Sequence, residues 1–144
     1  MSGTGKSTVL AELARRGHRV VDTDAGGWID DAGPEPLWRE YRMVGLLDEH
    51  AHGSLFVAGT VANQGRFYPR FDAVVLLSAP VDVILERLAT RETNEFGKSD
   101  TEREKIVDDL SWVEPLLRSG ATATIDTRRP LEDVVAELEL LAGA

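Results

Sequence analysis

Residues 1–8 of the chain read MSGTGKST, a glycine-rich segment that runs directly into a sequence with helical periodicity. Gly3 and Gly5 allow the backbone to curl tightly, because glycine has no Cβ that could collide with a bound group. The backbone N–H groups of such a turn, together with the positive end of the following helix dipole, form an anion site. Lys6 adds a cation for the outer phosphates of a nucleotide, and the Ser7 hydroxyl can ligate Mg²⁺. The segment therefore predicts a phosphate-binding loop.

The loop matches most of the Walker A pattern G-x-x-x-x-G-K-[ST], with Thr4 and Thr8 completing the set of nucleotide contacts. The first glycine of that pattern would fall one position before Met1. The alternative is a flexible start, rich in glycine and serine, that precedes a helix by chance. A buried central strand usually precedes this loop, and losing it would remove two ladders of hydrogen bonds and a large apolar area. We therefore expect translation to start upstream, with about six to ten further residues that form a strand.

Composition limits the class of protein. The 144 residues are enough for one domain with a single core, and 42% hydrophobic and 28% charged residues are ordinary globular proportions. The net charge of −9 argues against a general nucleic-acid binder, since affinity for the phosphate backbone depends on many Lys and Arg contacts. The absence of cysteine excludes a disulfide framework, a thiolate metal site and a cysteine nucleophile. No apolar run approaches membrane-spanning length and the N-terminus is polar, so we expect a cytoplasmic protein without a membrane partner.

Short apolar runs alternate with amphipathic segments along the chain. The spacing of apolar residues predicts helices over residues 6–17, 35–50, 80–91, 101–120 and 130–144, with Gly17 as a C-cap and Pro115 kinking or dividing the fourth. Strands are expected over residues 19–22, 54–60, 73–80 and 121–126. This alternation is typical of an α/β domain with a parallel sheet and right-handed crossovers. Ligands of such sheets bind at the carboxyl ends of the strands.

In this order the segments SGTGKST, VVDTD, FVAGT, VVLLSAP, RLATR and IDTRRPLEDVV form a pattern. The chain resembles the small P-loop kinases of the adenylate kinase and shikimate kinase type, and more closely the short bacterial proteins described as AAA-family ATP-binding proteins. The resemblance implies a P-loop NTPase three-layer sandwich with a parallel sheet of order 2-3-1-4-5, whose strand 1 is missing from this chain. It also implies a single nucleotide-binding domain over residues 1–144, with a lid around residues 91–101.

The resemblance assigns roles to two aspartates, one at the end of the predicted strand over residues 19–22 and one just after it. Asp22 would approach Mg²⁺, directly or through water, and Asp24 would face the acceptor hydroxyl. A carboxylate beside the attacking hydroxyl can orient it and accept its proton. The alternative is that both residues are solvated turn and capping residues without a chemical role.

The RLATR segment resembles the entry to the lid of nucleoside monophosphate kinases. There one arginine packs on the adenine and another contacts the transferring phosphates, so the resemblance gives Arg87 and Arg91 these roles. The planar guanidinium suits both tasks. The alternative for each is an ion pair or a solvated position on the surface. Thr127, Arg128 and Pro130 follow the last strand, where these kinases contact the adenine mainly through the backbone.

The acceptor pocket is expected from two segments, one before and one after the strand at residues 54–60. Its candidate residues are Trp28, Trp38, Arg39, Tyr41, Arg42, Asn63, Gln64, Arg66 and Arg70. Arginines there suit an acceptor that bears phosphate or carboxylate, whereas the aromatic residues have core packing as the alternative. The sequence AGTVANQG replaces the run of glycines that shikimate kinases carry after this strand, so the acceptor stays unnamed.

Together these features favour a Mg²⁺-dependent kinase that transfers the γ-phosphoryl group of ATP to a small-molecule acceptor, with Lys6, Asp24 and Arg91 as its catalytic residues. Two alternatives remain open at this point. One is a regulatory module that binds ATP and transfers nothing, and the other is a truncated, inactive chain.

Overall fold

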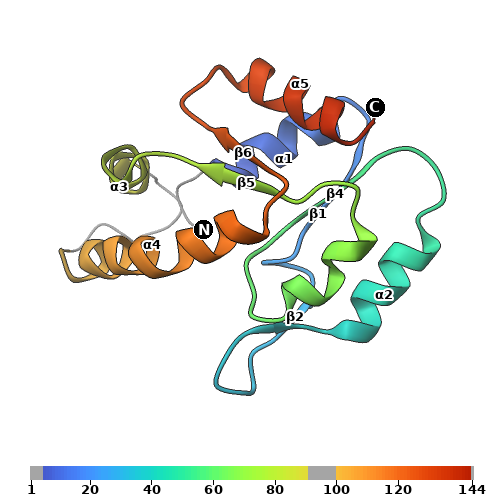
Figure 1. The fold of residues 1–144 in the computed structure, drawn as a ribbon, viewed down its shortest axis with the longest axis horizontal. Helices are drawn as coiled ribbons and strands as arrows, with labels where there is room; N and C mark the ends of the chain where they lie inside the picture. The colour runs from blue at the N-terminus through green and yellow to red at the C-terminus, as the bar shows by residue number, and fades with distance from the viewer. Residues whose placement is uncertain (1–4, 91–99, 144) are drawn as a thin grey trace. The chain divides into compact units, whose positions relative to one another are not determined.

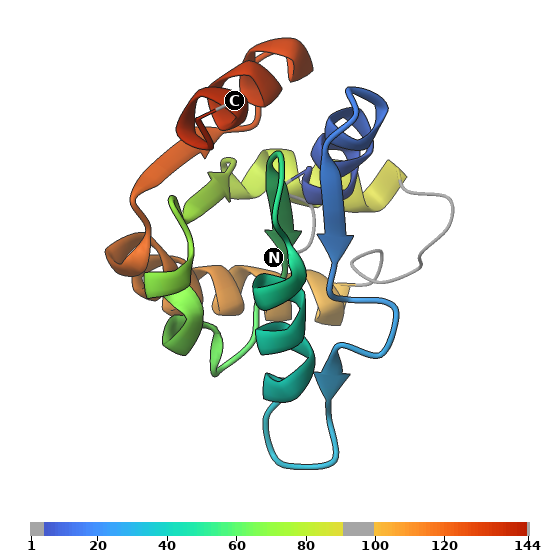
Figure 2. The same ribbon diagram turned by 90° about the vertical axis from the view of Figure 1, so that its right-hand side faces the viewer.

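The computed structural model describes residues 5–90 and 100–143 (Figures 1 and 2). The chain forms two compact units, each assembled from two separate segments. Unit one contains residues 1–6 and 74–130, and unit two contains residues 7–73 and 131–144. The boundary falls in the first turn of helix α1 (Lys6–Arg15).

Unit two contains a parallel pair of strands, β1 (Arg19–Asp22) and β4 (Leu55–Ala58), which lie side by side in Figure 1. Their register places Arg19 opposite Leu55 and Asp22 opposite Ala58, so both strands end at the same level. The unit also contains an antiparallel hairpin of β2 (Ile29–Asp30) and β3 (Leu37–Trp38). Its helices are most of α1, α2 (Glu40–Glu49), the 3-10 helix η1 (Gln64–Arg70) and α5 (Leu131–Leu141).

Helix α1 ends where the glycine pattern predicts. Gly17 has a φ of +91°, its N–H donates to Ala14 O at 3.0 Å, and the His18 N–H donates to Leu13 O at 3.1 Å. These two bonds are the Schellman motif, and they satisfy carbonyl groups that the end of a helix leaves without partners. His18 Nε2 lies 2.7 Å from Glu139 Oε2, which links α5 to the end of α1.

The interior of unit two contains an apolar cluster of Trp38, Met43, Val61 and Phe67, in which the Trp38 and Phe67 rings meet edge to face. This cluster holds the β2–β3 hairpin, α2 and η1 together. The two terminal helices also bury apolar side chains: Val9, Leu10 and Leu13 of α1, and Val134, Val135 and Leu138 of α5.

Unit one is built on a second parallel pair, β5 (Val75–Ser78) and β6 (Ala123–Asp126), with helices α3 (Val81–Thr90) and α4 (Asp100–Gly120) between them in sequence. Ile84 of α3 is fully buried and packs with Leu110 of α4. Helix α4 is a single helix that includes Pro115, so the proline does not divide it. Pro115 lies in the last turns of α4, where its missing N–H removes one hydrogen bond near the end.

The four predicted strands and their parallel pairing are present, giving a mixed α/β structure with short parallel sheets. The helix predicted over residues 35–50 is wrong in its first part, because Leu37 and Trp38 form strand β3. The Trp38 N–H donates to Asn63 Oδ1 at 2.9 Å and the Asn63 Nδ2 group donates to Trp38 O at 3.1 Å. A side chain therefore binds the backbone groups that a helix would use, and Pro36 favours an extended backbone just before them. No helix within the described residues is both long and apolar enough to cross a membrane.

Candidate functional site

The turn after β1 is anchored by a buried threonine. Thr23 is 1% exposed, its N–H donates to Ala58 O at 3.0 Å and its Oγ1 donates to the same oxygen at 2.8 Å. Trp38 Nε1 donates to Thr23 Oγ1 at 3.0 Å. The side chain between the two predicted site aspartates is thus fixed to β4 and to β3, and it holds the turn in place.

Asp22 and Asp24 occupy this turn with different exposure. The half-buried Asp22 accepts the Asp24 N–H on Oδ1 at 3.1 Å, whereas the Asp24 side chain is exposed. Asp22 therefore has the turn role that the sequence left open as the alternative to a chemical role.

Helix α1 begins at the predicted phosphate-binding loop. Ser7 and Thr8 are exposed in its first turn, which contains no acidic residue that would repel an anion. Ser7 and Asp22 both offer oxygen atoms, the ligands that Mg²⁺ prefers, so the donor set of unit two fits this ion. The described residues contain no group of three or more His, Cys, Asp or Glu that could hold a metal ion.

Gly5 lies in unit one beside two other candidate residues. Its φ is +93°, a conformation that favours glycine, and a Cβ placed on it would lie 3.8 Å from Arg87 Nη1 and from Thr127 Cβ. Arg87 Nη1 donates to Thr127 Oγ1 at 2.9 Å and Nη2 donates to Thr127 O at 3.0 Å. The structure thus brings together Gly5, Arg87 and Thr127 at the carboxyl ends of β5 and β6.

Arg128 forms an ion pair with the last residue of β6. Its Nη2 lies 2.6 Å from Asp126 Oδ2, and its backbone N–H donates to Asp126 Oδ1 at 2.9 Å. The Arg128 side chain holds the pKa of Asp126 at about 2, with its backbone N–H and the charge of Arg87 adding to the effect. The Arg128 guanidinium therefore already has a carboxylate partner. A ligand at this loop would contact the backbone groups of the loop.

Several predicted site residues lie outside the described part of the chain. They are Gly3 and Thr4 of the loop, Arg91, and most of the lid expected around residues 91–101. Lys6 is half-buried at the first position of α1.

Unit two contains an open cavity of about 760 Å³. It is lined by Asp30, Glu35, Leu37, Trp38, Arg39, Glu40, Tyr41, Ala62, Asn63, Gly65 and Arg66. Its volume is in the range of small-molecule sites. Trp38, a wall residue, is also the residue that binds Thr23, so the cavity and the Asp22–Asp24 turn share a rigid element.

Five of the nine predicted acceptor residues line this cavity: Trp38, Arg39, Tyr41, Asn63 and Arg66. Arg42 instead stacks on the Trp28 ring at 4.2 Å, and Arg70 pairs with Asp48. Gln64 binds the Val61 N–H and Tyr68. The acidic residues of the lining, Asp30, Glu35 and Glu40, were not among the predicted site residues. Nor was Thr23, although its place between two aspartates was a signal in the sequence.

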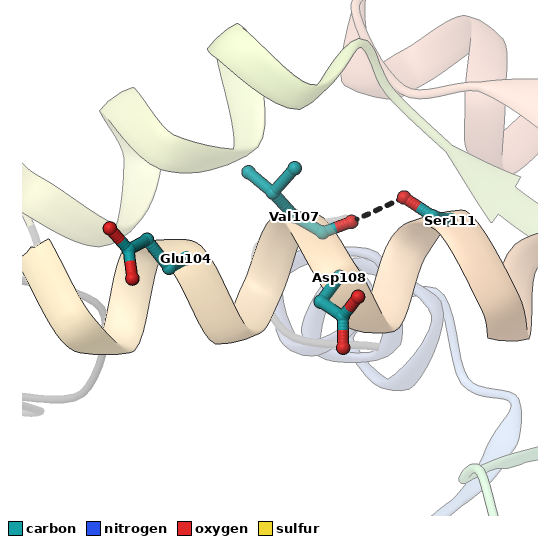
Figure 3. Close-up of a pocket in the computed structure, with 4 residues that line it drawn as sticks. All are labelled: Glu104, Val107, Asp108 and Ser111. Atoms are coloured by element: carbon teal, nitrogen blue, oxygen red, sulfur yellow. Dashed lines mark hydrogen bonds between the residues drawn. The ribbon is translucent and has the colours of Figure 1, made fainter.

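A second cavity, of about 370 Å³, lies along α4 in unit one, where Glu104, Val107, Asp108 and Ser111 line it (Figure 3). Ser111 Oγ donates to Val107 O at 2.8 Å within the helix. Among the described residues, its lining comes from α4 alone and includes no predicted site residue.

Two comparisons with known proteins identify the family of the chain. The family described as AAA domain matches residues 1–108, which include the loop, the Asp22–Asp24 turn and the cavity residues. The uncharacterized protein YqaC of Bacillus subtilis (strain 168) is 35% identical over 98 residues, 67% of this chain. The match spans 55% of the length of YqaC. The chain belongs to the AAA domain family of P-loop NTPase-like proteins, a family that includes kinases.

Proposed function

We propose that the protein is a Mg²⁺-dependent phosphotransferase that moves the γ-phosphoryl group of ATP to a small metabolite. The observation that carries the proposal is the loop itself: Gly5, at a φ of +93°, leads directly into Lys6 and Ser7 in the first turn of α1. Backbone N–H groups, a lysine and a hydroxyl in this order are what a nucleotide triphosphate and its metal ion require. The family match supports nucleotide binding and is compatible with kinase activity.

Each predicted residue has a defined task in this reaction. Lys6 stabilises negative charge on the phosphates, and Ser7 and Asp22 would hold Mg²⁺, which when bound neutralises phosphate charge. Asp24 orients the acceptor hydroxyl and takes its proton as the new O–P bond forms and the bond to ADP breaks. Arg91 contacts the transferring phosphoryl group from the lid. In phosphoryl transfer, positioning and charge neutralisation of this kind supply most of the catalysis.

The nucleotide base would lie against residues of unit one. Arg87 packs on the adenine, and the loop that contains Thr127 and Arg128 offers backbone groups to it. The pair of bonds from Arg87 to Thr127 supports this assignment, because it fixes the guanidinium next to Gly5.

The sheet order 2-3-1-4-5 is part of this proposal, and the two parallel strand pairs are compatible with it. The pair β1 and β4 corresponds to strands 2 and 3 of that order, and the pair β5 and β6 corresponds to strands 4 and 5.

The proposed function is tested by replacing the loop lysine. Lys6→Ala should abolish phosphoryl transfer and weaken Mg·ATP binding, measured by calorimetry and by a turnover assay against a panel of hydroxylated metabolites. Lys105→Ala, which removes an exposed lysine of α4, is the matched control and should behave like the unmodified protein. Normal ATP binding in Lys6→Ala would refute the nucleotide site. Tight ATP binding by the unmodified protein, with no phosphorylated product from any metabolite, would instead indicate a regulatory module.

A further inference from the structure

We propose that Arg39 is the anion anchor of the cavity in unit two, and that the occupant is a small hydroxylated acid whose carboxylate or phosphate group binds its guanidinium. The identification of this occupant as the phosphoryl acceptor rests on the proposed function. The binding of the anion by Arg39 does not.

Three of the four predicted acceptor arginines are already engaged. Arg42 donates to Gly26 O at 2.5 Å while it stacks on Trp28, which fixes it to the loop after Asp24. Arg66 Nη1 lies 2.7 Å from Glu40 Oε1. Arg70 Nη2 lies 2.7 Å from Asp48 Oδ1 and is outside the cavity lining.

Arg39 differs from these three. It is half-buried and lines the cavity, yet within residues 5–90 and 100–143 its side chain makes no hydrogen bond, ion pair or ring contact. A half-buried cation without a partner is costly, because its solvation is reduced and nothing replaces it. An anionic ligand would supply the missing partner through a bidentate contact, for which a guanidinium is well suited.

The rest of the lining indicates the other properties of the ligand. The cavity contains three carboxylates, of which Glu40 is neutralised by Arg66 and Asp30 accepts the Ala32 N–H at 3.1 Å. Carboxylates accept hydrogen bonds from hydroxyl groups and would repel a second anionic group on the ligand. Tyr41 is 74% exposed and Leu37 is 40% exposed, so carbon atoms of the ligand could cover apolar surface there. A small acid with one anionic group and several hydroxyl groups matches this lining.

The cavity wall is hydrogen-bonded to the proposed catalytic turn. Trp38 is bound by its backbone to Asn63 and by its indole to Thr23, the residue between Asp22 and Asp24. A ligand that contacts this wall therefore stays in a fixed relation to the turn.

The experiment is a ¹⁵N NMR titration of the full chain with three probes of similar size: glycerol, glycerate and glycerol 3-phosphate. Glycerol is the neutral control, and the two acids distinguish a carboxylate from a phosphate ligand. The Trp38 indole N–H and the backbone N–H of Leu37 and Tyr41 report on the cavity, whereas the Gly5 N–H reports on the phosphate-binding loop. The titration is repeated with Arg39→Gln, with Arg39→Met as a second variant, and with Arg70→Gln as the matched arginine control.

At least one acid should shift the cavity signals in the unmodified protein and in Arg70→Gln. Affinity should fall roughly ten- to a hundredfold in both Arg39 variants, the usual effect of losing a hydrogen bond to a charged group. The proposal is overturned if glycerol shifts the same signals as strongly, if both Arg39 variants respond like the unmodified protein, or if neither acid shifts the cavity signals. Mg·ATP binding by the same sample, measured separately, shows whether the phosphotransferase proposal stands or fails on its own.

Discussion

Trp38 Nε1 donates a hydrogen bond of 3.0 Å to Thr23 Oγ1, and both side chains are almost completely buried. The bond joins strand β3 to the turn that contains Asp22 and Asp24. Gly59 lies against the same pair: a Cβ placed on it would lie 2.1 Å from Thr23 Oγ1 and 3.3 Å from the Trp38 indole. The absence of a side chain at position 59 is therefore what allows this bond to form.

Gly59→Ala should lower the free energy of unfolding by about 1–3 kcal/mol, the usual cost of inserting a methyl group into a packed interior. Thr23 cannot move aside without breaking its bonds to Ala58 O and to Trp38. The measurement is urea denaturation followed by circular dichroism. Gly45→Ala is the control: nothing lies within 4 Å of the added methyl group in helix α2, so stability should rise by about 0.5–1 kcal/mol.

A double-mutant cycle identifies the collision as the cause. In a Thr23→Ala background the oxygen that the new methyl group would meet is absent, so adding Gly59→Ala should cost less there than in the unmodified protein. Strictly additive effects of the two substitutions would contradict this account of Gly59.

Asp24→Asn should reduce phosphoryl transfer roughly a hundred- to ten-thousandfold, the usual contribution of a positioned general base. ATP affinity should stay unchanged, because the turn uses the backbone N–H of residue 24, which asparagine retains. Single-turnover kinetics and calorimetry measure the two quantities. Asp31→Asn, at an exposed aspartate, is the control and should leave both unchanged. Normal turnover in Asp24→Asn would make Asp24 a structural residue.

Arg87→Gln should weaken ATP binding about tenfold or more, because the guanidinium that lies next to Gly5 is lost. Thr127→Val should have a smaller effect, since Arg87 keeps its bond to Thr127 O when Oγ1 is removed. Arg118→Gln removes an exposed arginine that pairs with Glu114 on α4, and it should not change the affinity. If Arg87→Gln lowers the melting temperature while ATP affinity is unchanged, Arg87 is only a link between α3 and β6.

Acidification should destabilise the protein between about pH 4.5 and pH 2. Bonds from Arg15 and Arg16 lower the pKa of Glu12 from 4.5 to about 2, and Arg128 lowers that of Asp126 from 3.8 to about 2. Because the folded state holds these groups ionised, their stabilisation is complete above the ordinary values and is lost as the pH falls through the lowered ones. Melting temperatures measured from pH 7 to pH 2 should fall over this interval, and less steeply in Glu12→Gln with Asp126→Asn. An identical slope in that double variant would contradict the assignment.

Sequence periodicity predicted the elements that bury a continuous apolar face. The four parallel strands and helices α1, α3 and α5 are of this kind, and Gly17 marked the end of α1 because only a left-handed residue permits its hydrogen bonds. The β2–β3 hairpin was not predictable from local pattern. Its strands contain two residues each, and β3 depends on the side chain of Asn63, which lies 25 residues away in sequence.

Candidate residues could be predicted from the sequence where they lie at strand ends. Asp22 is the last residue of β1 and Thr127 follows β6, positions where parallel sheets bind their ligands. The sequence could not show which of the four acceptor arginines would be available to bind an anion, since their chemistry is identical and only their partners differ. The pairing of Arg66 with Glu40 and the stacking of Arg42 on Trp28 are tertiary contacts that leave no signal in the local sequence.

The placement of Trp38 makes it a built-in optical reporter. Its indole is 6% exposed, is bonded to Thr23 and forms part of the cavity wall, whereas Trp112 of α4 is 74% exposed. Emission from Trp112 should be quenched readily by acrylamide, and emission from Trp38 should resist quenching. In a variant with Trp112→Phe and Trp28→Phe, Trp38 would be the remaining tryptophan and the source of the tryptophan fluorescence. Ligand binding in the cavity could then be followed in real time without a label.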